Sequence, residues 1–143
     1  MTDMRATGYH VFRELLPGVL PDGADSIGDG GFGDELLEIG VESVFGRLWG
    51  RDGLSRRDRS LVTLGILIAL RATDELQFHV QIARNNGLTE DEIAEVIYHS
   101  SGYAGFPAAN SACKVARKCC RGMSSLRLWS RLGESNPRPS HYE

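Results

Sequence analysis

The sequence has few cysteines, and the three that it has form no known motif. Cys113, Cys119 and Cys120 include no C-x-x-C pair, and an odd number of thiols does not describe a disulfide framework. The four histidines include no H-x₃₋₅-H pair, so a zinc site with well-spaced ligands is not expected. These absences favour free thiols in a reducing compartment and no metal site.

Long hydrophobic runs are also missing. The longest nearly uncharged apolar run, residues 60–70, is about half of what a bilayer-spanning helix needs. Residues 1–20 lack the basic start, apolar centre and small-residue cleavage site of a secretory signal, so we expect a cytoplasmic protein without membrane association. A chain of 143 residues with 41% hydrophobic and 24% charged residues is typical of one globular domain, and two independent cores are not expected.

The chain has no excess of basic charge. Residues 1–120 carry 12 basic and 17 acidic side chains, whereas residues 121–143 carry 4 and 2. An acidic body offers no broad electrostatic surface for phosphates, so a nucleic-acid partner is not expected. The local basic group at Arg56 and Arg57 is interpreted as the solvated start of a helix.

Signals for β-strands are absent, and the pattern predicts an all-α bundle of about six helices. Residues 34–49 are expected to be helical, with Leu37, Val41, Val44, Phe45 and Leu48 on one buried stripe. The remaining helices are expected at about residues 10–16, 55–71, 73–86, 89–101 and 107–117, with a Gly- and Asp-rich loop over residues 21–33.

The expected helix ends follow from capping residues. Ser55, Thr73 and Thr89 are candidate N-caps, and Glu92 completes a capping box with Thr89. Residues 61–70 are apolar on all faces, which predicts a central buried helix. Gly102 and Gly105 are expected to bracket a tight connection to a final helix, whose face of small residues comprises Ala108, Ala109, Ala112, Val115 and Ala116.

The last segment of the chain differs in composition from the rest. Residues 121–143 are rich in Ser, Arg, Pro and Gly, and Pro137 and Pro139 exclude a helix there. We therefore expect one helical domain over residues 1–120 and a flexible tail without a catalytic role. Residues 133–143 resemble the product of a reading frame that runs into a tRNA gene on the opposite strand; a genuine disordered terminus is the alternative.

Glu75 and His79 are the first candidate catalytic pair. They are four residues apart on one expected helix and therefore share a face. A neighbouring carboxylate would raise the pKa of the imidazole and orient it, which would make His79 a proton donor near neutral pH. The alternative, a solvent-exposed ion pair, is common at this spacing and is favoured on spacing alone.

Two further groups could bind an anionic substrate. Arg51 and Arg59 could each hold a carboxylate with two hydrogen bonds, and Arg59 precedes the apolar part of its helix. Tyr103 and the free backbone N–H groups near Pro107 stand at a glycine-containing corner. The alternatives are a solvated loop charge for Arg51 and a simple helix connection at the corner.

Six stretches of the sequence resemble the 4-carboxymuconolactone decarboxylase family, in the alkylhydroperoxidase D-like superfamily. They are residues 45–54 (FGRLWGRDGL), 59–63 (RSLVT), 75–79 (ELQFH), 85–89 (NNGLT), 92–97 (EIAEVI) and 103–109 (YAGFPAA). The resemblance implies a homo-oligomer, a hexamer or trimer of such helical bundles. It also implies cofactor-free decarboxylation of a dicarboxylate lactone, in protocatechuate catabolism.

The resemblance also implies roles for the candidate residues. His79 would be the proton donor and Glu75 its orienting partner, while Arg51 and Arg59 would bind carboxylates. Tyr103 and the N–H groups near Pro107 would hold the lactone oxygen. Peroxide-reducing members of the superfamily carry a C-x-x-C motif before the histidine, but Ala72 and Glu75 stand at its two positions here. Peroxiredoxin-like activity, a non-catalytic anion-binding oligomer and a truncated inactive product remain the alternatives.

Overall fold

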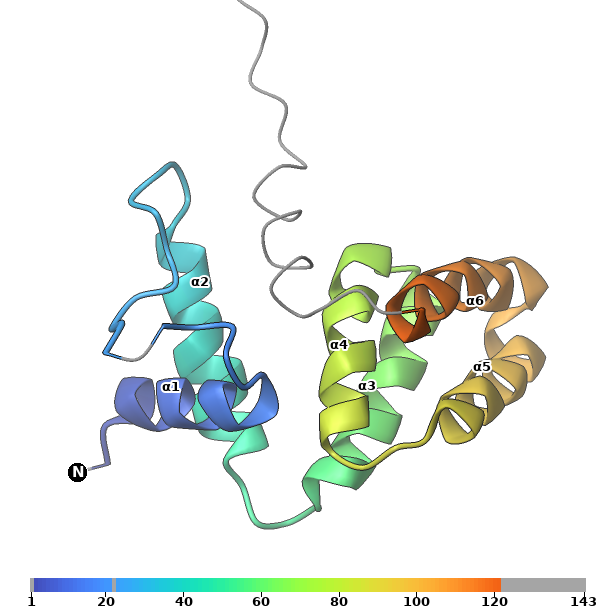
Figure 1. The fold of residues 1–143 in the computed structure, drawn as a ribbon, viewed down its shortest axis with the longest axis horizontal. Helices are drawn as coiled ribbons and strands as arrows, with labels where there is room; N and C mark the ends of the chain where they lie inside the picture. The colour runs from blue at the N-terminus through green and yellow to red at the C-terminus, as the bar shows by residue number, and fades with distance from the viewer. Residues whose placement is uncertain (1, 22, 122–143) are drawn as a thin grey trace, which may run out of the picture.

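The computed structural model describes residues 2–21 and 23–121, so the expected tail lies outside the described residues except for Arg121. The described part is all-α, which confirms the expected fold class (Figure 1). Its elements are α1 (Met4–Leu15), α2 (Glu35–Gly40), the π-helix η1 (Val41–Trp49), α3 (Arg56–Leu70), α4 (Thr73–Asn85), α5 (Glu90–Ala104) and α6 (Phe106–Cys120).

Capping side chains start several of these helices. The Ser55 hydroxyl accepts from the backbone N–H of Asp58 at 3.1 Å, and Thr89 and Glu92 form the expected capping box. The expected cap at Thr73 is wrong, because α4 begins there and Ala72 occupies the N-cap position without a side-chain bond. Helix α1 begins six residues earlier than expected, since the Asp3 carboxylate caps its first turn.

The segment expected as one helix over residues 34–49 changes its winding at Val41. Helix α2 continues directly into η1, where backbone bonds run from i to i+5 and each turn takes more residues than in an α-helix. The expected stripe is therefore wrong in part. Leu37, Val44 and Leu48 are exposed, while the buried positions are Val41, Gly46 and Trp49, with Phe45 partly buried.

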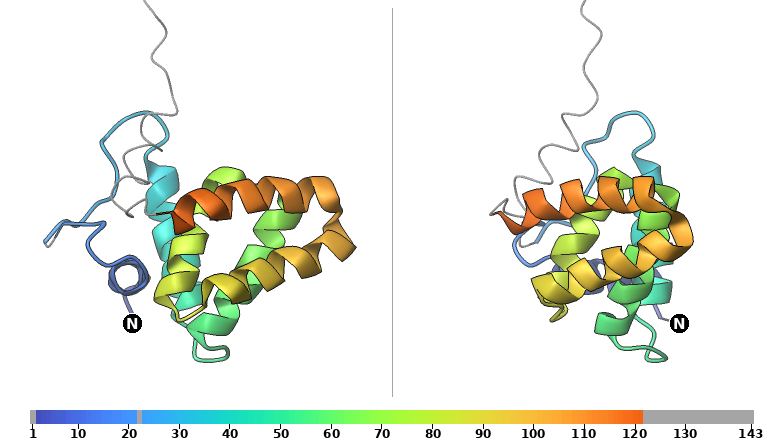
Figure 2. Two further views of the ribbon diagram at one scale, coloured as in Figure 1. Left: turned by 45° about the vertical axis from the view of Figure 1, so that its right-hand side comes forward. Right: turned by 90° about the vertical axis from the view of Figure 1, so that its right-hand side faces the viewer.

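The described residues form two hydrophobic clusters where the sequence predicts one core. One cluster lies among α3, α4, α5 and α6, which pack on one another (Figure 2). The second lies between α1 and η1 and includes Phe12, Val41 and Trp49. Helix α4 belongs to both, because Val80 faces the first cluster and Ile82 the second. Helix α4 is therefore the element that connects the two clusters.

Two neighbouring amides at the end of α4 reinforce this connection. The Asn85 side chain donates to the carbonyl of Leu15 at 2.8 Å, which ties α4 to the end of α1. The Asn86 side chain donates to Ser60 Oγ at 3.0 Å and to the carbonyl of Arg56 at 3.3 Å, which ties it to α3. Ser60 is buried, so this bond satisfies its hydroxyl.

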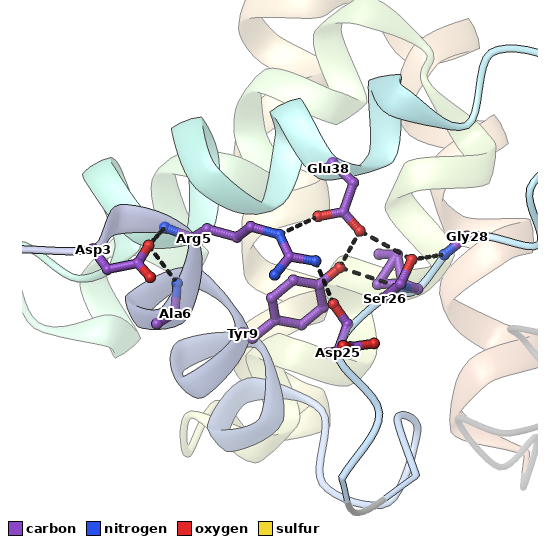
Figure 3. Close-up of polar contacts among 9 residues, drawn as sticks. Asp3, Arg5, Ala6, Tyr9, Asp25, Ser26, Gly28 and Glu38 are labelled. Atoms are coloured by element: carbon purple, nitrogen blue, oxygen red, sulfur yellow. Dashed lines mark hydrogen bonds and ion pairs between the residues drawn. The ribbon is translucent and has the colours of Figure 1, made fainter.

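A polar network holds α2 and the preceding loop against α1 (Figure 3). The carboxylate of Glu38 accepts from the Tyr9 hydroxyl and from Arg5 Nε, and Ser26 Oγ donates to it at 3.1 Å. The Tyr9 hydroxyl in turn accepts from the backbone N–H of Ile27 at 3.2 Å. The hydrogen bond from Tyr9 holds the pKa of Glu38 below its usual range, so the carboxylate stays charged and keeps these donors.

The apolar sequence of α3 predicts a helix that is buried on all sides, but one side of it is exposed. Ser60, Leu64 and Ile68 face the core, but Val62, Ile66 and Leu70 are 54%, 53% and 70% exposed. These three residues are four apart and form one apolar stripe on the surface, named here the α3 stripe. The expected small-residue face of α6 is confirmed, because it is buried against the other helices.

The connection between α5 and α6 is shorter than expected. Gly105 alone makes the corner, with φ 93°, and Gly102 lies inside α5. Pro107 stands in the first turn of α6, where its missing N–H leaves no bond unmade. Within the described residues no helix is both long and apolar enough to cross a membrane.

Gly8 should tolerate no side chain, because a Cβ there would lie 2.2 Å from the Val41 carbonyl oxygen. We expect Gly8→Ala to lower the free energy of unfolding by about 1–3 kcal/mol, since α1 and η1 would have to separate. Gly102→Ala is the matched control, because that helical position has open space. Urea unfolding should show no loss of stability for the control. Equal losses of stability in both variants would contradict the close approach of α1 and η1.

Candidate active site

Helix α4 presents His79 to the cluster between α1 and η1. The imidazole borders a pocket of about 110 Å³. Its other lining residues come from three helices and are Phe12, Leu16, Phe45, Glu75, Phe78 and Ile82. All but Glu75 are apolar, so His79 lies in a largely hydrophobic setting.

Trp49, the last residue of η1, stacks on the imidazole. The two ring centroids are 6.1 Å apart and the ring planes differ by 22°. Nδ1 of His79 is buried and has no hydrogen-bond partner. Trp49 is not among the site residues expected from the sequence; the one signal for it was its place inside the family-like stretch over residues 45–54.

The surroundings of His79 change its expected protonation. Burial lowers the pKa of His79 to about 4, so the expectation that the Glu75 carboxylate would raise it is wrong. Among the described residues no hydrogen bond or ion pair joins Glu75 to His79, and Glu75 is exposed. Loss of water around the charged imidazole therefore outweighs any attraction from Glu75, and His79 is neutral near pH 7.

Arg59, on α3, contacts the segment that follows η1. Its Nη2 donates to the backbone carbonyl of Arg51 at 3.1 Å, and its Nε is buried without a partner. Among the described residues, Arg59 Nε and His79 Nδ1 are the two buried side-chain nitrogen or oxygen atoms that lack a partner. Trp49 contacts His79, and Arg51 accepts the hydrogen bond from Arg59. Both residues therefore contact the same three-residue segment, 49–51.

The structure does not bring the remaining candidates to this place within one chain. Tyr103 is 86% exposed at the corner between α5 and α6, where its ring lies 5.2 Å from that of His99. Pro107 is exposed at the same corner. This corner lies at the end of the helical bundle away from α1 and η1 (Figures 1 and 2). The Arg51 side chain is also exposed.

The cysteines lie outside this site. Cys119 is buried on α6, and burial raises the pKa of its thiol to about 11. A thiol with such a pKa is a poor nucleophile at neutral pH, because the thiolate is the reactive form. In the described part of the chain, no group of three His, Cys, Asp or Glu residues is arranged to hold a metal ion.

A known protein family matches more than half of the chain. Residues 35–118 match the family described as the carboxymuconolactone decarboxylase family. The chain belongs to the carboxymuconolactone decarboxylase family. The matched range begins with α2 and contains every candidate site residue, from Arg51 to Pro107, together with Trp49.

Curated relatives of this family member include named decarboxylases. A 4-carboxymuconolactone decarboxylase of Acinetobacter baylyi is 49% identical over 75 residues, which cover 52% of this chain and 56% of the relative. The nitrosuccinic acid decarboxylase npaB of Metarhizium robertsii is 42% identical over 91 residues, which cover 64% and 62%. An uncharacterized 15.0 kDa protein of Paracoccus denitrificans is 34% identical over 79 residues. The chain spans little more than half the length of the relatives it matches.

The lowered pKa of His79 predicts how this family member responds to acid. Between pH 6.5 and 4 the unfolded chain takes up a proton at His79 that the folded chain does not, so stability falls as the pH falls through this window. His79→Gln removes this site of proton uptake. Between pH 7 and pH 5, the free energy of unfolding of the variant should fall by about 2 kcal/mol less than that of the wild type.

Urea unfolding at several pH values measures this difference. His10→Gln, at an exposed position of α1, controls for the loss of an imidazole. Parallel stability curves for the wild type and His79→Gln would mean that the imidazole is hydrated in the folded chain.

Proposed function

We propose that the chain catalyses the cofactor-independent decarboxylation of 4-carboxymuconolactone to the enol-lactone of 3-oxoadipate, a step of protocatechuate catabolism. The observation that carries the proposal is the pair of buried, unpartnered nitrogens of His79 and Arg59 beside residues 49–51. A buried donor without a partner costs about 1–3 kcal/mol, and a bound carboxylate would relieve that cost. The names of the first two relatives support the reaction class.

The chemistry asks little of the protein beyond binding and one proton. When the carboxylate leaves as CO₂, the electrons of the broken C–C bond move through the ring double bond into the lactone carbonyl. The resulting dienolate is then protonated on carbon. Because the substrate provides its own electron sink, the chain needs to bind anions, stabilise a developing oxyanion and deliver one proton.

The residues in the site are suited to these tasks. Arg59 would bind a substrate carboxylate through its free Nε, and Arg51 would add a second cation from its exposed loop. His79 is neutral in the free chain, so its role as acid requires a proton taken up with the substrate. The negative charges of the dicarboxylate favour that uptake, since an opposite charge stabilises the imidazolium. Glu75 lines the pocket and would orient the protonated ring.

Assembly into a homo-oligomer, a hexamer or trimer, is part of the proposal. The pocket at His79 measures about 110 Å³, well below the roughly 300–1,000 Å³ of usual ligand pockets. A larger open groove of about 580 Å³ lies elsewhere, between α3 and α5 beside the α3 stripe. A second copy covering this apolar surface would bury it, and Tyr103 and Pro107 would then contribute to the site of a neighbouring subunit.

Turnover of 4-carboxymuconolactone, followed by absorbance, tests the reaction. We expect His79→Ala to lower kcat by roughly 10²–10⁴-fold with the assembly intact, because general acid catalysis is lost. His10→Ala is the control, since its imidazole is exposed on α1. Unchanged turnover in His79→Ala would remove His79 from the mechanism.

Two further measurements separate the alternatives. Alkylation of the three cysteines should leave turnover intact, whereas its loss would favour thiol-dependent peroxide reduction. A lactone that binds without turnover would indicate an anion-binding protein. If nitrosuccinate is decarboxylated and the lactone is not, the reaction class stands and the substrate is corrected.

Ile66→Asp tests assembly, because it places a charge in the middle of the α3 stripe. We expect this variant to run as a smaller species than the wild type in sedimentation velocity, since a buried unpaired charge opposes association. Asp74→Asn, at an exposed polar position of α4, is the control. A wild-type chain that sediments as a monomer at all concentrations would contradict the proposed oligomer.

A further inference from the structure

We propose that Trp49 is a positioning residue for His79, whose indole ring fixes the plane of the imidazole and keeps water from one of its faces. This inference rests on the proposed function, in which His79 delivers the proton. Trp49 itself carries no acid or base, so it would act through His79 and not on the substrate.

The first support is the stacking geometry. Trp49 is 5% exposed, and its ring lies nearly parallel to the imidazole, at 22° and a centroid distance of 6.1 Å. Nδ1 of His79 has no hydrogen-bond partner. In many proteins a hydrogen bond to one ring nitrogen sets the orientation of a histidine, and here the indole stacked on the ring face would set the ring plane instead.

The second support is the rigidity of the element that carries Trp49. Helix η1 packs so closely on α1 that a Cβ at Gly46 would lie 2.4 Å from the carbonyl oxygen of Met4. Val41, at the other end of η1, is 1% exposed. An indole held by such an element has little freedom of its own, so it offers the imidazole a fixed surface to pack against.

The charged groups around the imidazole are few. Phe12 and Leu16 face the pocket from α1, and Phe45 faces it from η1. Among the described residues that line it, Glu75 is the charged one, on the same helix as His79. From α3, Arg59 reaches the carbonyl of Arg51, two residues after Trp49. Removing the indole would therefore admit water and bring no new charge to the imidazole.

Fixing the ring plane matters for the reaction, because a proton must reach one carbon of the ring-shaped intermediate. Small losses of alignment cost large factors in rate when the reacting atoms are held at contact distance. A donor ring that rotates freely would spend much of its time misaligned. Shielding matters as well, since water beside the imidazole would stabilise its charged form before substrate binds.

Trp49→Leu and Trp49→Phe test the proposal. With 4-carboxymuconolactone as substrate, we expect Trp49→Leu to lower kcat roughly tenfold or more at pH 7. We also expect it to raise the apparent pKa of His79 in the kcat/KM profile by about 1 unit or more, from about 4 toward the ordinary 6.5. Trp49→Phe keeps a flat ring and should restore most of the rate and the wild-type profile.

Val41→Ala is the matched control for destabilisation. It removes a buried side chain from η1 in the same cluster, but Val41 does not line the pocket. It should lower stability without moving the pH profile. If Val41→Ala shifts the profile as far as Trp49→Leu does, the effect is structural and the inference is wrong.

NMR titration of the histidine ring protons separates this inference from the proposed function. The signal of His79 is assigned by its absence in His79→Gln. We expect its midpoint to lie higher in Trp49→Leu than in the wild type, even if the chain turns over no lactone. Equal midpoints in the two proteins overturn the inference, and turnover that depends on His79 would then leave the proposed function standing.

Discussion

The site depends on one packing arrangement, in which α4 belongs to two hydrophobic clusters at once. One side of this helix completes the bundle of α3, α5 and α6, and the other side completes the cluster of α1 and η1. His79 projects toward the second cluster, where η1 ends. Without α1 and η1, its imidazole would face solvent, and the rest of the bundle would still have its own core.

This arrangement gives the histidine a chemistry that spacing alone did not predict. Apolar residues around the imidazole lower its pKa, whereas a carboxylate four residues earlier in the sequence suggested the opposite. The free chain therefore holds a neutral imidazole and a guanidinium, each with one unsatisfied buried nitrogen. In the proposed function, an anionic substrate would provide both the missing hydrogen-bond partner and the charge that favours protonation.

Local signals in the sequence predicted local features well. The all-α class, the caps at Ser55 and Thr89, and the buried small-residue face of α6 all follow from short-range patterns. Features that depend on packing could not be predicted from such short-range patterns. The change to a π-helix at Val41 has no sequence periodicity of its own, and the contact between Gly8 and Val41 joins residues 33 positions apart.

The candidate site was likewise predictable only in part. The resemblance to a family pointed to His79 and Arg59, and each of them contacts a residue of the segment 49–51 in the structure. It did not indicate that Tyr103 and Pro107 lie at the corner between α5 and α6 and outside the pocket at His79, because sequence order does not show which helix ends meet. Nor did periodicity separate the buried face of α3 from the α3 stripe, since residues 61–70 are apolar on all faces.

The winding of η1 also limits how this segment can change in length. Nine residues bonded from i to i+5 make fewer turns than the same nine would in an α-helix, where each residue advances by about 100°. If η1 rewound as an α-helix, Trp49 would rotate away from the imidazole, although every side chain in the segment stayed the same. Loss of one residue would compensate for that rotation. Insertions and deletions between Val41 and Trp49 would therefore turn the indole relative to the histidine, even where Trp49 itself is kept.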